Sequence, residues 1–139
     1  MSAVAARPLL EDFESARIDP AGFRHADHVR VAWELLGESS LPRAMERMRE
    51  ALQRITALAG RPERYHETIT FGWILLVADR IAQRGRGESF ETFAASNPDL
   101  LDAGLLSAWY RAETLASPGA RRAFRMPDRR APAEPATGS

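Results

Sequence analysis

Cysteine and lysine are both absent from this sequence of 139 residues. Without cysteine the chain has no disulfide framework and no thiolate ligand, so any bound metal is held by nitrogen or oxygen. All 19 basic residues are therefore arginine. The absence of lysine excludes a Schiff-base mechanism that uses a lysine amine.

Net charge and long apolar runs are also lacking. The 19 basic and 19 acidic side chains balance at a formal charge of zero, which argues against a general nucleic-acid binder. No run approaches the ~18 apolar residues of a membrane span, and the N-terminus has no apolar core typical of a signal peptide. We therefore expect a soluble, cytoplasmic protein that binds no nucleic acid and no membrane.

Hydrophobic residues recur at helical spacing, and no segment alternates as a strand does. Proline, glycine and capping residues predict helices over 9–16, 20–36, 40–60, 62–84, 89–96 and 101–116. We predict an all-α fold, a small helical bundle of about five to six helices with up-down connections. Residues 1–126 would form one domain, and the periodicity ends at Pro127, which predicts a disordered tail over 127–139.

The three histidines of the chain lie in two short motifs, Phe23-Arg-His-Ala-Asp-His28 and Tyr65-His-Glu-Thr68. At 100° per residue, His25 and His28 fall on the apolar face of the 20–36 helix, one turn apart. His66 lies near the start of the 62–84 helix, which is apolar on every side from Ile69 to Ala78 and is predicted to be central.

These positions predict a metal site. Short connections make consecutive helices antiparallel, so the second and fourth helices begin at the same end of the bundle. Two imidazoles on one helix and one on a facing helix suit a single divalent transition metal and leave a coordination position open. We predict a mononuclear site of His25, His28 and His66, with zinc, iron, copper, nickel and manganese all open.

Three polar residues beside the histidines are candidates for catalysis. Glu67 adjoins His66 and would serve as acid or base, although a glutamate in the first turn of a helix is also favoured by the helix dipole. Tyr65 and Thr70 would contact the substrate or a ligand residue. Arg24 and Arg64 flank the motifs and are interpreted first as part of a solvated helix face, with binding of a carboxylate or phosphate as the alternative.

A second pattern extends the motifs toward the C-terminus. Phe23-x-His25-x-x-His28 and Tyr65-His66-Glu67-Thr68 are followed by Tyr110-Arg111, Leu115-x-Ser117, Ala120-Arg121, Phe124 and Pro127-Asp128. Together they resemble a family of small bacterial all-helical proteins, and this resemblance implies no particular activity. In architecture alone the chain is similar to the DinB-like bundles, which hold a metal with three histidines but space them differently.

The leading functional hypothesis is a metal-dependent enzyme acting on a small-molecule substrate by hydrolysis, isomerisation or oxidation. The alternative is a helical module that binds a ligand or partner without catalysis and keeps its histidines in the core. A haem-binding protein is a third hypothesis. A homodimer is left open.

Overall fold

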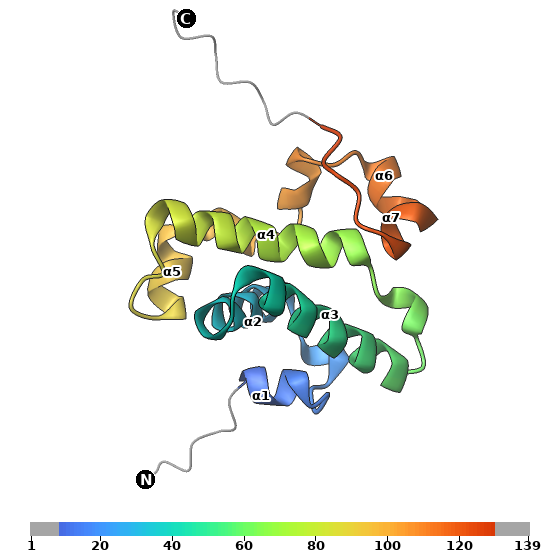
Figure 1. The fold of residues 1–139 in the computed structure, drawn as a ribbon, viewed down its shortest axis with the longest axis horizontal. Coiled ribbons are helices and arrows are strands. Elements are labelled where there is room, and N and C mark those ends of the chain that lie inside the picture. The colour runs from blue at the N-terminus through green and yellow to red at the C-terminus, as the bar shows by residue number, and fades with distance from the viewer. Residues whose placement is uncertain (1–8, 130–139) are drawn as a thin grey trace, which may run out of the picture.

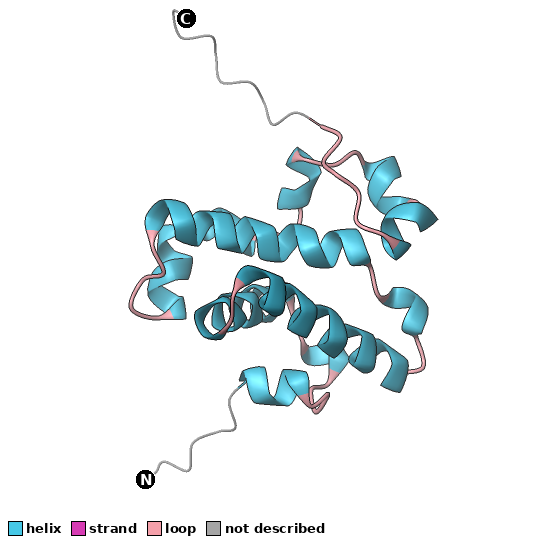
Figure 2. Ribbon diagram, viewed as in Figure 1, coloured by secondary structure: helices cyan, strands magenta, loops and turns pink. Residues whose placement is uncertain are grey.

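The computed structural model describes residues 9–129, and within them it contains seven α-helices, four short 3-10 helices and no strand. The α-helices are α1 (Leu9–Glu14), α2 (His25–Glu38), α3 (Leu41–Leu58), α4 (Glu67–Arg84), α5 (Phe90–Ser96), α6 (Ala112–Ala116) and α7 (Pro118–Arg122). The 3-10 helices are η1 (Pro20–Gly22), η2 (Pro62–Arg64), η3 (Pro98–Leu101) and η4 (Leu105–Ala108). The predicted all-α class is confirmed, as Figures 1 and 2 show.

The three long helices form the body of the molecule. In Figure 1, α3 and α4 run in opposite directions and α2 lies beside both. The small α1 covers α2 and α3 on one side, and α6 and α7 gather near the start of α4 on the other. The core between these helices contains fully buried Phe13, Leu35, Ile74, Val77 and Phe93.

Helix α2 differs from the predicted 20–36 helix at both ends, because Pro20–Gly22 form the separate η1 and α2 continues two residues past Leu36. Gly37 lies inside the helix, which ends at Glu38, one residue before the Ser39 cap. A Cβ at Gly37 would lie 2.6 Å from the Arg86 guanidinium, so the glycine makes room for this side chain. Arg86 in turn stacks 3.9 Å from the centre of the Trp33 ring and donates to the Trp33 carbonyl. The glycine therefore serves packing rather than termination.

The predicted helix over 62–84 is divided in two. Pro62 starts only the short η2, Tyr65 is extended with φ −64° and ψ 137°, and α4 begins at Glu67. His66 is the N-cap of α4, because its ring accepts a hydrogen bond from the Ile69 N–H. The prediction that His66 lies inside the helix was wrong, since a side-chain cap at this residue begins a separate helix.

The predicted helix over 101–116 is wrong as well. Asp102 accepts a hydrogen bond from the Gly104 N–H in a turn, and the segment breaks into η3, η4 and α6. Such local bonds from an aspartate compete with a continuous helix. The N–H groups of Asp128 and Arg129, predicted to be in the tail, donate to the Trp109 carbonyl of the domain. The rest of that tail, 130–139, lies outside the described residues.

Candidate functional site

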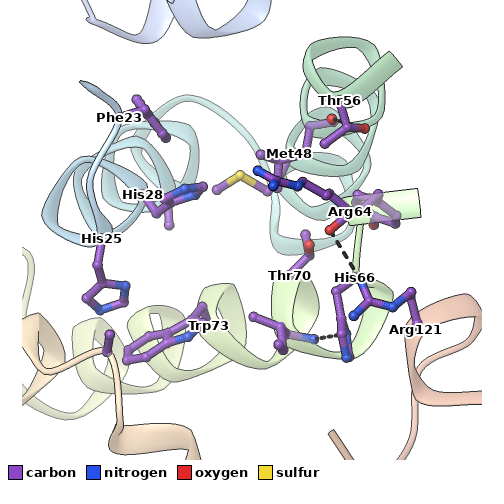
Figure 3. Close-up of a pocket in the computed structure, with 15 residues that line it drawn as sticks. Phe23, His25, His28, Met48, Thr56, Arg64, His66, Thr70, Trp73 and Arg121 are labelled. Atoms are coloured by element: carbon purple, nitrogen blue, oxygen red, sulfur yellow. Dashed lines mark hydrogen bonds between the residues drawn. The ribbon is translucent and has the colours of Figure 1, made fainter. Parts of the chain in front are cut away.

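All three histidines line one cavity of about 570 Å³ between the long helices. Its walls come from α2, α3, α4 and η2, with Arg121 of α7 and Ala103 completing them (Figure 3). The lining residues are Phe23, His25, His28, Ala32, Met48, Leu52, Thr56, Arg64, Tyr65, His66, Ile69, Thr70, Trp73, Ala103 and Arg121. A concave, mostly apolar space of this size is typical of small-molecule sites.

His25 and His28 reach the cavity from the first turn of α2. The Nε2 atom of His25 lies 2.9 Å from the Leu100 carbonyl, to which it donates. The His25 ring also contacts Trp73 edge-on, with 4.3 Å between ring centres. This histidine is thus fixed between a backbone acceptor and an aromatic wall.

The imidazole of His28 makes no hydrogen bond to any residue of 9–129. Its only ring contact within this range is with Phe23, at 4.5 Å between ring centres. Burial, with a smaller contribution from the neighbouring His25, lowers the pKa of His28 to about 4. His28 is therefore a neutral imidazole at pH 7, with both ring nitrogens left for a ligand.

His66 is fully engaged by the protein itself. Its Nδ1 accepts from the Ile69 N–H at 3.1 Å, and its Nε2 lies 2.7 Å from the Leu115 carbonyl. Because a carbonyl only accepts, the proton sits on Nε2 and the ring is neutral. Burial lowers the pKa of the His66 ring below its ordinary value. The side chain is 7% exposed and has no lone pair to spare.

The three imidazoles thus share a cavity without forming a metal centre in this arrangement. No group of three histidine, aspartate or glutamate side chains within residues 9–129 is placed to hold a metal ion. A metal ligand needs a free lone pair on nitrogen, and His66 has already used its own. The residues as they stand do not fit the predicted three-histidine coordination.

Glu67 lies outside this cavity. The residue is 5% exposed, and its carboxylate accepts hydrogen bonds from both Nε and Nη2 of Arg49 on α3, the first at 3.1 Å. The Tyr65 hydroxyl donates to the same carboxylate at 2.6 Å. Buried carboxylates need such compensation, and this one has it. The contacts make Glu67 an anchor between α3 and α4, and the expectation that it acts as acid or base stays a prediction.

The other two predicted polar residues do line the cavity. Thr70 is 8% exposed and follows His66 by one turn. Burial and the bond to Glu67 raise the pKa of Tyr65 above its ordinary value, so its phenol stays protonated and serves as a donor.

The residues of the second motif pattern are physically linked to the first. Thr68 is fully buried on α4 and donates to the Ala120 carbonyl at 2.7 Å, while its oxygen accepts from the Arg125 N–H at 3.1 Å. Together with the bond from His66 to Leu115, it attaches the C-terminal helices to α4. Successive residues of the Tyr65–Thr68 motif therefore point in alternate directions. Tyr65 and Glu67 face α3, whereas His66 and Thr68 face the C-terminal segment.

Arg121 is a charged lining residue that was not among the predicted site residues. Its Nη1 donates to the Glu63 carbonyl at 3.0 Å and to the Arg64 carbonyl at 3.4 Å, which fixes η2 against α7 (Figure 3). The only sequence signal was its membership of the Ala120-Arg121 motif, because nothing in the helical pattern brings residue 121 near residue 64.

The fold and the cavity define a small all-helical protein with a histidine-lined site. The chain matches no protein-family model, no curated protein and no solved structure in the comparisons made. Among the described helices, none has both the length and the apolar character required to cross a bilayer.

Proposed function

We propose that this protein binds a small molecule in the cavity between α2, α3 and α4. The observation that carries the proposal is that all three histidines of the chain, from two separate motifs, line this one cavity. Burying imidazoles is unfavourable unless they have partners. His25 and His66 bond to backbone carbonyls, whereas His28 has no such partner among the described residues. A bound molecule would supply it.

The walls suit a pre-formed site. Each of the three long helices contributes side chains to the cavity, and the histidines at its edges are held by Leu100 and Leu115. Polar groups fixed in this way orient a ligand at little entropic cost. His28 would then contact the polar part of the ligand, with the aromatic and aliphatic lining around the remainder.

A neutral dye tests the proposal. N-phenyl-1-naphthylamine should bind saturably at about one per chain, with energy transfer from tryptophan that Trp73→Phe reduces. Ala32→Phe should weaken binding at least tenfold, because Ala32 is 1% exposed and lines the cavity. Ala26→Phe, on the exposed side of the same helix, is the matched control. If Ala32→Phe does not fold, Ala103→Phe replaces it. Unsaturable binding, or equal binding by the lining and control variants, would overturn the proposal.

A metal-dependent enzyme is the second candidate, and the shared cavity of the three histidines favours it. His25, His28 and His66 would be the ligands, and a metal would supply Lewis-acid chemistry to a bound substrate. For His66 to bind a metal through Nε2, its hydrogen bond to the Leu115 carbonyl would have to break. Metal content of untagged protein, beside a variant with all three histidines replaced by alanine, tests this candidate. One metal per chain in the parent and none in the variant would support it, and no metal in either would reject it. A visible absorption spectrum tests for haem in the same sample.

A further inference from the structure

We infer that the ligand of this cavity is an organic anion, with an acidic headgroup beside Arg64 and an apolar body toward Trp73. This inference rests on the proposed binding function and names the chemical class of the ligand. It begins with the charges of the cavity wall. Arg64 and Arg121 both line the cavity, and no aspartate or glutamate among residues 9–129 lines it. The wall is therefore positive in a chain whose formal charge is zero.

Neither of these arginines is neutralised by a carboxylate of the described residues. Five other arginines form ion pairs with aspartate or glutamate side chains, namely Arg30, Arg43, Arg47, Arg49 and Arg80. The Arg64 guanidinium has no hydrogen bond or ion pair within 9–129, and in Figure 3 it extends from η2 into the cavity toward His28. Its five N–H donors are available to a headgroup.

Arg121 prepares the position of that headgroup. Its Nη1 donates to the carbonyls of Glu63 and Arg64, while its Nη2 and Nε make no hydrogen bond to another residue of 9–129. Because the bonded carbonyls belong to η2, Arg121 also fixes the backbone from which Arg64 extends. The Arg64 guanidinium, carried by a backbone that Arg121 holds in place, offers the planar donor geometry that suits carboxylate and phosphate.

The remainder of the cavity is lined mainly by apolar side chains, which suit the hydrocarbon part of a ligand. Phe23, Met48, Leu52, Ile69 and Trp73 line it, and the edge-on contact of His25 with Trp73 adds a further aromatic wall. A bare inorganic anion would leave this apolar surface hydrated. A headgroup joined to an aromatic or branched aliphatic body fills both parts.

Two dyes that differ by one charged group test the headgroup. N-phenyl-1-naphthylamine is neutral, and 8-anilino-1-naphthalenesulfonate carries a sulfonate on the same skeleton. We expect the wild type to bind the sulfonate about tenfold more tightly than the neutral dye, as charge-assisted hydrogen bonds imply. Arg64→Gln should abolish that preference and leave the neutral dye unaffected, and Arg64→Lys should restore part of it. Arg61→Gln removes an exposed charge that does not line the cavity and should change nothing.

The outcomes separate this inference from the proposed function. If both dyes bind equally, or Arg64→Gln leaves the preference intact, the anion inference is overturned while the cavity remains a binding site. If neither dye responds to Ala32→Phe or Ala103→Phe, the proposed function itself fails. Competition tests the apolar body, because phenylacetate should displace the sulfonate dye and inorganic phosphate at the same concentration should not. Equal displacement by phosphate would overturn that part.

Discussion

The Nε2 atom of His66 lies 2.7 Å from the carbonyl oxygen of Leu115, and this hydrogen bond joins the start of α4 to the end of α6. The same ring caps α4 through Nδ1. One histidine thus begins the central helix and attaches the C-terminal segment to it.

Replacing this histidine should therefore destabilise the fold in two separable steps. His66→Ala removes the cap and the bond to Leu115, and we expect a loss of about 2 kcal/mol in the free energy of unfolding. His66→Asn keeps a capping side chain and should lose about half as much. Urea denaturation measures both variants. Equal losses in the two variants would show that the cap contributes nothing.

The pair of Arg49 and Glu67 should be energetically coupled. Arg49→Met leaves the Glu67 carboxylate buried without its cation, while Glu67→Gln removes the charge that needs compensation. A double-mutant cycle should give a coupling of about 1–2 kcal/mol, reduced from that of a fully buried pair because the Arg49 side chain is 45% exposed. The exposed pair of Arg43 and Glu46 is the control and should couple by less than about 0.5 kcal/mol. Equal coupling in the two pairs would contradict the anchoring role of Glu67.

Stability should fall in acid through His28. The folded pKa of about 4 lies below the ordinary 6.5. As the pH falls from 6.5 to 4, the unfolded chain binds the proton first, so unfolding becomes easier by roughly 2–3 kcal/mol. Above pH 6.5 both states are neutral and no effect is expected. The lowered pKa of His66 acts in the same direction.

The variant His28→Gln isolates this effect from the carboxylates that titrate in the same range. Its free energy of unfolding, followed by urea denaturation at several pH values, should fall less steeply than that of the wild type between pH 6.5 and 4. Parallel curves for the two proteins would show that His28 does not resist protonation in the folded state.

Thr68 should control the attachment of the C-terminal segment. Thr68→Val keeps the shape of the side chain but leaves the carbonyls of Ala120 and Ala123 and the Arg125 N–H without this partner. We expect a loss of about 2 kcal/mol, with faster amide hydrogen exchange over 118–128 and little change in α3. Thr56→Val is the control, because that hydroxyl bonds only to carbonyls of its own helix. Uniform acceleration across the chain would indicate global destabilisation instead.

Several helices could be predicted from the sequence because capping residues and apolar periodicity are local features. Ser40 caps α3 and Ser89 caps α5 through their own hydroxyls, and the apolar stripe of α3 buries Met48 and Ile55. The helical face that carries His25 and His28 follows from the 3.6-residue period alone. The region after Leu101 could not be read in this way, since its apolar spacing resembles a helix but turn bonds such as that of Asp102 interrupt it.

Composition and local periodicity were enough to establish the all-helical class, to exclude thiolate and lysine chemistry, and to locate the two motifs that contain every histidine. The use of those side chains depends on long-range packing. From sequence spacing alone, His66 and Glu67 were predicted to contact a metal or a substrate. In the folded chain they are hydrogen-bonded to residues distant in sequence, His66 to Leu115 and Glu67 to Arg49. The placement of Arg121 beside η2 is likewise a long-range contact. Local periodicity fixes which face of a helix a residue occupies, whereas its chemistry depends on neighbours that only packing brings together.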